Sequence, residues 1–143
     1  MPQQANIVDK QMLDYAIPAQ APDEPNRVFV CTGKLQVGFY ASETNGQEVE
    51  KTFTALIEPN PPLTARQFHR AIATASIANV QLQDTQPNLW DHFRWGVVEA
   101  QADLDDETGQ AELRVTVMIA TSGPGTWVGI SDVAFQVTIL ARV

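Results

Sequence analysis

The residue types best suited to binding a polar ligand gather within residues 89–95. This stretch holds Trp90, Asp91, His92, Arg94 and Trp95. An indole can stack on the apolar face of a sugar ring, while carboxylate, imidazole and guanidinium groups hydrogen-bond to neighbouring hydroxyls. Aromatic residues ahead of a β-strand also serve as core or interface anchors, and Asp91 can simply cap the strand or pair with Arg94. The stretch is therefore either a carbohydrate-binding site or a set of residues that anchor the core or an interface.

A second candidate is the aromatic residue Trp127, which follows a Gly-Pro-Gly segment at residues 123–125. Such a segment turns the chain sharply and presents the next side chain at the end of a loop. There the indole can face solvent or a neighbouring subunit. The alternative is that Trp127 closes one end of the fold.

Signatures of enzymes and metal sites are not found in the sequence. It has no nucleophile elbow, Walker motif, dinucleotide-binding glycine motif or HExxH motif. The two histidines, His69 and His92, are too far apart to form a helical metal pair. The acids that could bind a metal are better explained as a solvated hairpin tip; they are Asp103, Asp105, Asp106 and Glu107. We therefore predict a non-enzymatic protein without a metal or cofactor.

The composition of the chain indicates which binding partners and which cellular compartment to expect. The 143 residues carry a net charge of −8, and the nine basic residues are scattered, so nucleic acid and anionic membranes are poor partners. No apolar run reaches the length of a membrane span, and the first residues do not form a secretion signal. The single cysteine, Cys31, excludes an intrachain disulfide. We expect synthesis in the cytoplasm without a signal peptide, followed by release on lysis or incorporation into a particle.

The C-terminal half shows the alternation of antiparallel strands. We expect one apolar face of a strand to be formed by Val98, Ala100, Ala102 and Leu104. A charged segment that ends at Gly109 then interrupts the alternation. Two further alternating runs follow. They comprise Ala111, Leu113, Val115, Val117 and Ile119, and then Val133, Phe135, Val137, Ile139 and Ala141. The pattern predicts a hairpin and a further strand, each with one apolar face.

The N-terminal half is less regular. Residues 1–26 contain four prolines and no sustained period, so they are expected to be an arm or linker, either attached to a partner subunit or frayed. Within them, residues 7–16 are expected to form a turn or two of helix or one loosely packed strand. Residues 28–41 and 51–57 read as strands around an Asn45-Gly46 turn. For residues 63–75 the first interpretation is a short helix with Thr64 as N-cap that leads into a strand over residues 77–82. The second is one long strand.

Together these elements predict an all-β protein, an antiparallel β-sandwich of six or seven strands over residues 27–143 with an extended N-terminal arm and at most one short helix. Several apolar residues are expected on the outer face as well; they are Leu56, Trp95, Val97, Met118 and Leu140. A monomeric sandwich should be more polar on its outside, so we predict a homo-oligomer.

Short motifs across residues 27–143 resemble the H-type lectin family of trimer-forming, six-stranded β-sandwiches. The matching positions, in chain order, are Arg27-Val28, Gly33-Lys34-Leu35, Phe53, Pro61-Pro62, Ile77-Ala78-Asn79-Val80, Phe93-Arg94-Trp95, Thr108-Gly109, Thr126-Trp127 and Thr138-Ile139-Leu140-Ala141. They are similar to the family's opening strand, its F…PP…strand segment, its arginine-bearing strand, its TGF-like turn and its TW … V.W.A ending.

The sequence also departs from this family. Val128-Gly129 replaces a polar pair typical of sugar-binding members, Ile139 replaces an indole, the hairpin is longer, and residues 63–75 are an insertion or a helix. In the family, ligands bind in clefts between subunits. The resemblance therefore implies a trimer or hexamer in which His92, Arg94 and Trp127, with Asp91 close by, contact the ligand.

Three functions from different classes follow, the last of which is an enzyme of unrecognised type, which a deep pocket containing acids with perturbed pKa values would indicate. The first is a non-enzymatic, oligomeric β-sandwich module that binds carbohydrate weakly at each site and gains avidity from repeated copies. The second is a structural or assembly protein, such as a phage-tail, capsid or sheath component, built on the same sandwich.

Overall fold

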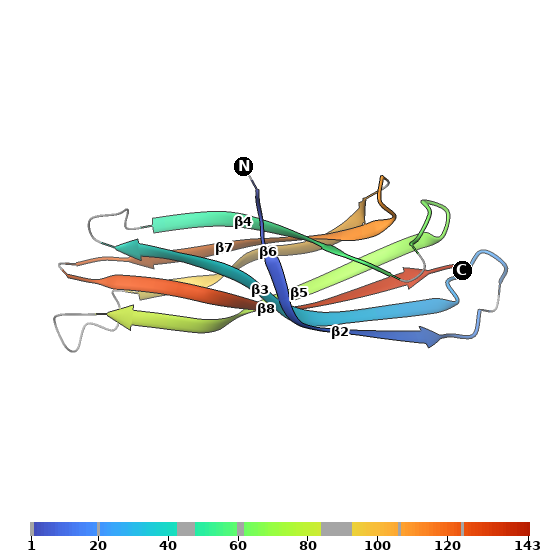
Figure 1. The fold of residues 1–143 in the computed structure, drawn as a ribbon, viewed down its shortest axis with the longest axis horizontal. Coiled ribbons are helices and arrows are strands. Elements are labelled where there is room, and N and C mark those ends of the chain that lie inside the picture. Colours follow the sequence, from blue (N-terminus) through green and yellow to red (C-terminus); the bar gives the residue numbers. More distant parts are fainter. Residues whose placement is uncertain are drawn as a thin grey trace.

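The computed structural model describes residues 2–19, 21–42, 48–59, 62–83, 93–105, 107–123 and 125–143. Within these ranges the chain forms two four-stranded sheets and no helix, which confirms the predicted all-β sandwich (Figure 1). The strands are β1 (Gln3–Gln4), β2 (Asn6–Ala16), β3 (Arg27–Ser42), β4 (Glu48–Ile57), β5 (Phe68–Gln83), β6 (Phe93–Asp105), β7 (Gln110–Thr121) and β8 (Trp127–Ala141).

We call the sheet with strand order β1-β4-β7-β6 sheet A and the sheet with order β2-β3-β8-β5 sheet B. All neighbouring strands are antiparallel except the short β1–β4 pair. Only β2–β3 and β6–β7 pair with their neighbours in the chain, while the other connections cross between sheets. Most strands run along the long axis of the molecule, and the crossing from β1 to β2 lies near its middle (Figure 1).

The β6–β7 hairpin shows how local chemistry sets the register. One carboxylate oxygen of Asp105 accepts a hydrogen bond from the N–H of Glu107 and the other from the hydroxyl of Thr108, both at 3.1 Å. Gly109 has a φ of +71°, a conformation that side chains with a Cβ rarely adopt, and a Cβ there would lie 2.9 Å from the carbonyl oxygen of Leu63. The turn therefore requires glycine.

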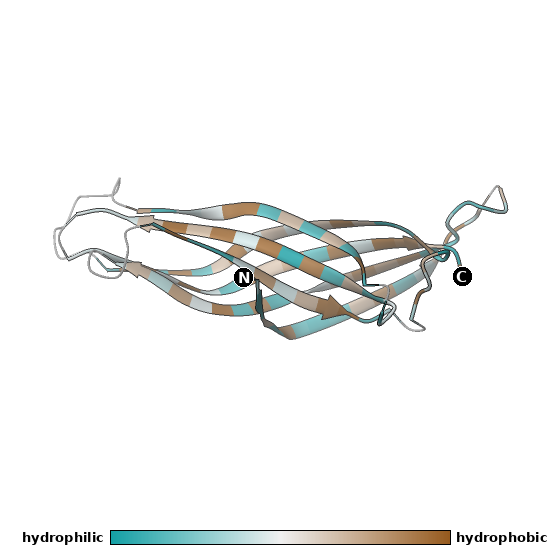
Figure 2. Ribbon diagram, turned by 90° about the horizontal axis from the view of Figure 1, so that it is seen from above, coloured by the Kyte–Doolittle hydropathy of each residue, from teal (hydrophilic) through white to brown (hydrophobic). Residues whose placement is uncertain are grey.

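The core lies between the sheets and follows the predicted alternation. The inward residues predicted for the runs at 111–119 and 133–141 are all buried. In Figure 2 brown and teal bands alternate along the strands, as expected when one face of each strand is apolar. Phe39 of sheet B and Phe53 of sheet A meet across the core with ring centroids 5.5 Å apart.

The expected face of β6 is shifted in its first half. A register irregularity between Val97 and Glu99 inserts an extra residue opposite β7. Val97 therefore packs on the core together with Ala100, whereas Val98, which was predicted to face inward, is exposed. A bulge reverses the alternation of every residue on one side of it, so the prediction for Val97 and Val98 was wrong.

The short helix expected at residues 63–75 is not formed. The carbonyl of Thr64 accepts hydrogen bonds from the N–H groups of Gln67 and Phe68, which makes a single turn before β5 begins at Phe68. From there the chain pairs with β8, and Ala71, Ala73 and Ala75 pack against the core. Sheet pairing and burial therefore outweigh the local helical pattern, and the second interpretation, a long strand, is the one observed.

The first residues of the chain join both sheets. β1 pairs with β4, the N–H of Ala5 donates to the carbonyl of Thr54, and β2 then pairs with β3. Figure 1 shows this segment passing from one sheet to the other. Ile7 and Met12 pack against the core. Residues 3–16, which the sequence suggested to be part of an arm, are thus edge strands of the sandwich. The described residues contain no helix long and apolar enough to cross a bilayer.

Candidate ligand-binding site

Trp127 lies on the outer face of sheet B. It is the first residue of β8 and is paired with Ser42 and Gln83. The next residue, Val128, is fully buried, so alternation places the half-buried indole on the outside. Trp127 therefore does not close the end of the sandwich.

The indole forms a platform with a tyrosine ring of the neighbouring strand. Trp127 stacks with Tyr40 at a centroid distance of 5.9 Å and an interplanar angle of 27°. A Cβ added to Gly129 would lie only 2.4 Å from Cη2 of Trp127, so the indole lies directly over the backbone of Gly129. Tyr40 remains 46% exposed. We call Tyr40 and Trp127 the aromatic platform.

The aromatic platform borders a small open hollow of about 190 Å³. Its lining consists of Gly38, Phe39, Tyr40, Gln81, Trp127, Gly129, Ile130 and Ser131. Drug-sized ligands occupy pockets of roughly 300–1,000 Å³, so this hollow suits a single ring. Gln81 brings an amide, and the Ser131 hydroxyl lies 3.2 Å from Oδ2 of Asp132, to which it donates. The site thus offers two ring faces and a few neutral polar groups.

Arg94 lies on the other sheet. It is in β6 opposite Ala120, and its guanidinium lies 4.0 Å from the carboxylate of Glu48. Both side chains are about two-thirds exposed, at 68% and 65%, so this ion pair contributes little to stability. Arg94 and Trp127 therefore occupy outer faces of opposite sheets, whose backbones are about 10 Å apart. The structure does not bring them together within one chain.

Two of the other predicted site residues, Asp91 and His92, lie outside the described residues, as does Trp90. Trp95 is described; it lies in β6 opposite Ile119 and is exposed. Of the two predicted ligand-binding residues that the structure describes, Trp127 lines the hollow beside the aromatic platform and Arg94 does not.

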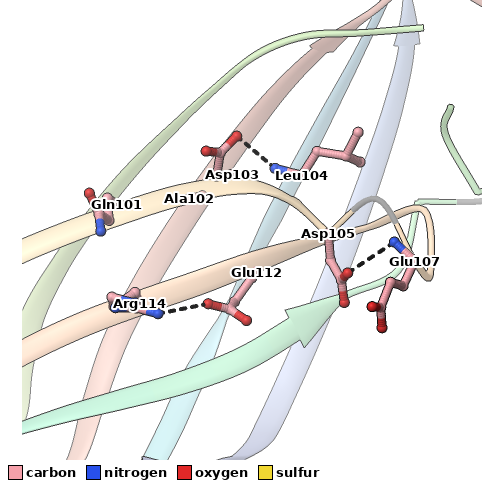
Figure 3. Close-up of a pocket in the computed structure, with 8 residues that line it drawn as sticks. All are labelled: Gln101, Ala102, Asp103, Leu104, Asp105, Glu107, Glu112 and Arg114. Carbon is pink, nitrogen blue, oxygen red and sulfur yellow. Dashed lines mark hydrogen bonds and ion pairs between the residues drawn. The ribbon is translucent and has the colours of Figure 1, made fainter. Parts of the chain in front are cut away.

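A second hollow, of about 560 Å³, lies at the β6–β7 hairpin (Figure 3). Its acids are Asp103, Asp105, Glu107 and Glu112, and Arg114 pairs with Glu112 at 3.3 Å. Asp105 holds the turn, and Asp103 accepts a hydrogen bond from the N–H of Leu104. Among the described residues, no group of three or more His, Cys, Asp or Glu side chains is arranged to hold a metal ion. These acids serve the local hairpin structure.

Two titratable groups of sheet B have shifted pKa values, and both shifts have structural causes. Burial raises the pKa of the Cys31 thiol, an effect that the nearby charge of Lys10 partly opposes. The hydrogen bond to Asp14 raises the pKa of the Arg27 guanidinium, whose Nε lies 2.8 Å from Oδ1 of Asp14. These groups stabilise the fold around β2 and β3, away from the aromatic platform.

The sequence interpretation missed the partners of Trp127. Gly129 could have been found, because a residue two positions along a strand lies on the same face. Tyr40 and Gln81 could not, because they reach Gly129 only through the register of β3 and β5 with β8. Comparison of the sequence with protein-family models found no match, and comparisons with curated proteins and with solved structures also found none.

Proposed function

We propose that this protein is a non-enzymatic binding module that recognises a sugar ring on the aromatic platform. The observation that carries the proposal is the arrangement of Tyr40 and Trp127 around a hollow that accommodates one ring. Aromatic faces bind the apolar C–H face of a pyranose, and such surfaces also exclude water. Gln81 and Ser131 supply the neutral donors and acceptors that hydroxyl groups need.

Self-association is the second part of this proposal. Two neighbouring rows of side chains cross the outer face of sheet B; one joins Leu13, Val30, Thr138 and Ile72, and the other joins Tyr15, Val28, Leu140 and Arg70. We call the six apolar residues of these rows the apolar patch. Leu13, Tyr15 and Ile72 are 52%, 50% and 47% exposed. Exposed apolar side chains gathered on one face favour association, and these two rows contain no acid in a chain of net charge −8, so we assign the patch to a second copy.

Oligomerisation would also give Arg94 a role. The resemblance to H-type lectins implies ligand sites in clefts between subunits, and Arg94 and Trp127 lie on opposite faces of a single chain. We propose that Arg94 of one copy approaches the aromatic platform of the next. Repeated shallow sites would then bind a multivalent glycan by avidity.

The test is a glycan array followed by calorimetric titration with the sugars that bind. Trp127→Ala should weaken binding at least about tenfold, equivalent to about 1.4 kcal/mol. Gly129→Ala should act similarly, because its Cβ displaces the indole while both rings are retained. Trp95→Ala is the matched control, since it removes an exposed indole from the other sheet and should leave binding unchanged. Failure of the wild-type protein to bind any sugar on the array would overturn the proposal.

The apolar patch also favours a second function, that of a structural component of a particle or filament. In that case the protein should form large assemblies without any sugar, visible by light scattering and electron microscopy. Tyr15→Lys in the apolar patch should abolish them, and Trp127→Ala should leave them intact. Assemblies that need the aromatic platform and disappear on addition of sugar would contradict this alternative.

A further inference from the structure

The two edges of sheet B are built differently. Its β2 edge is irregular, because the pairing with β3 shifts between Val8 and Gln11 and Asp9 has a φ of +54°. This edge also carries the charges of Asp9, Lys10 and Asp14. Bulges and charges are the usual protection of an edge strand against pairing with another chain. The β2 edge is thus protected.

The β5 edge has neither a bulge nor a charge over residues 71–77. This stretch reads Ala-Ile-Ala-Thr-Ala-Ser-Ile and contains no charge, proline or glycine. Its pairing with β8 is regular from Arg70 to Ile77. In the part of the chain that the structure describes, no strand hydrogen-bonds to its other side, and the nearest strand there is β6 of sheet A. A regular, uncharged edge presents free N–H and C=O groups in the geometry that another strand requires.

We propose that two copies of this chain pair antiparallel along residues 71–77 of β5, about a two-fold axis at Thr74. Thr74 then faces its own counterpart, Ala73 faces Ala75, and Ile72 faces Ser76. The stretch is self-complementary because every directly opposed pair contains a small or hydroxyl-bearing residue. A two-fold contact uses the same surface on both copies, as this one does, and it joins the two B sheets into one sheet of eight strands.

Charge favours β5 over the other edge on the same side of the molecule. The neighbouring edge strand of sheet A, β6, carries Glu99, Asp103 and Asp105. β5 contains no acid, and its charged residue is Arg70, just outside the pairing stretch. Two chains that each carry a net charge of −8 repel one another, so an edge without acids is the one at which they can approach.

The pairing would also place both apolar patches on one face of the joined sheet. Ile72 belongs to the patch and lies on β5, and since it faces Ser76 of the second copy, the two patches lie on opposite sides of the two-fold axis. Such a contact makes a dimer by itself and a hexamer when it is combined with a three-fold contact. This inference deepens the self-association proposed above and does not depend on sugar binding.

The test compares Thr74→Lys with Gln11→Lys by sedimentation equilibrium. The two positions lie in the same cross-strand row of sheet B, at its β5 and β2 edges, and both side chains are exposed. Thr74→Lys places two ammonium groups opposite one another, which should weaken dimerisation at least tenfold. Gln11→Lys, with the same change of charge, should keep the wild-type mass of at least twice 15.7 kDa.

Two further measurements keep the proposal falsifiable. A mixture of Thr74→Lys and Thr74→Glu chains should recover the dimer, and the amide protons of residues 71–77 in the wild type should exchange more slowly as protein concentration rises. An oligomeric wild type whose mass is unchanged by Thr74→Lys would overturn the β5 pairing alone. A wild type that is monomeric at all concentrations would also overturn the self-association proposed above.

Discussion

The outer faces of the two sheets differ although their inner faces follow the same pattern. On sheet A the outer face is polar; the hydroxyls of Thr52 and Thr116 lie 2.8 Å apart, and Arg114 pairs with Glu112. On sheet B the outer face carries the apolar patch at one end and the aromatic platform towards the other. Val30 and Tyr40 are ten residues apart on β3, which corresponds to about 33 Å of strand.

The inner and outer faces of the sheets therefore have different roles. The inner faces of both sheets supply the burial on which stability depends. An outer face need only be soluble, so apolar and aromatic side chains on one outer face but not the other indicate contacts outside the chain. We therefore expect changes on the inner faces to alter stability and changes on the outer face of sheet B to alter association and binding.

The largest expected effect is on the shared core. Leu113→Ala in sheet A and Ile139→Ala in sheet B each remove a fully buried side chain and should lower the free energy of unfolding by about 2–5 kcal/mol. Leu56→Ala, on the half-buried outer face of sheet A, should cost less than about 1 kcal/mol. Denaturant unfolding gives these values. A small cost for either core change would mean that the two sheets do not share the core equally.

The next effect distinguishes the outer faces directly. Val30→Lys places a charge within the apolar patch, and Thr54→Lys places one at a half-buried position on the outer face of sheet A. Val30→Lys should weaken self-association at least about tenfold, or about 1.4 kcal/mol, because the ammonium group would have to be desolvated. Thr54→Lys should change it less than about twofold. Equal effects in analytical ultracentrifugation would remove the distinction between the faces.

Removing a hydroxyl should have opposite consequences on the two faces. Thr116→Val breaks the hydroxyl pair with Thr52 and should cost about 1 kcal/mol of unfolding free energy. Thr138→Val, between Val30 and Ile72, should change stability by less than about 0.5 kcal/mol and should strengthen association by extending the apolar patch. Unfolding and sedimentation experiments on both variants test this pair. A stability loss at Thr138 as large as that at Thr116 would contradict it.

The parts of the fold that could be predicted from sequence are those that rest on local alternation. Apolar residues at every second position of β7 and of the second half of β8 are buried, so these strands and their inner residues could be predicted. Residues 63–75 were ambiguous because alanines at 65, 71 and 75 satisfy a helical stripe, while those at 71, 73 and 75 satisfy a strand. Pairing with β8, which is more than 50 residues away in the chain, decides in favour of the strand.

The candidate site was predictable only in part for the same reason. Trp127 could be singled out from the turn that precedes it, and Arg94 from its aromatic neighbours. Their placement on opposite outer faces depends on which sheet each strand joins, and β6 and β8 join different sheets. The bulge at Val97 and Val98 likewise depends on the facing strand and leaves no local signal.

The smallest expected effect concerns the inner side of sheet B, where Cys31 is fully buried. Burial raises the pKa of its thiol, so the folded protein holds the proton more tightly than the unfolded chain, whose thiol pKa is about 8.5. This contribution to stability is complete below the unfolded pKa and is lost as pH rises through the folded pKa. Between pH 8 and 10 the free energy of unfolding of the wild type should therefore fall more steeply than that of Cys31→Ala, in which the other titrating groups are retained. Equal slopes in urea titrations, together with rapid alkylation of the native thiol at pH 9, would show that water reaches this side of sheet B.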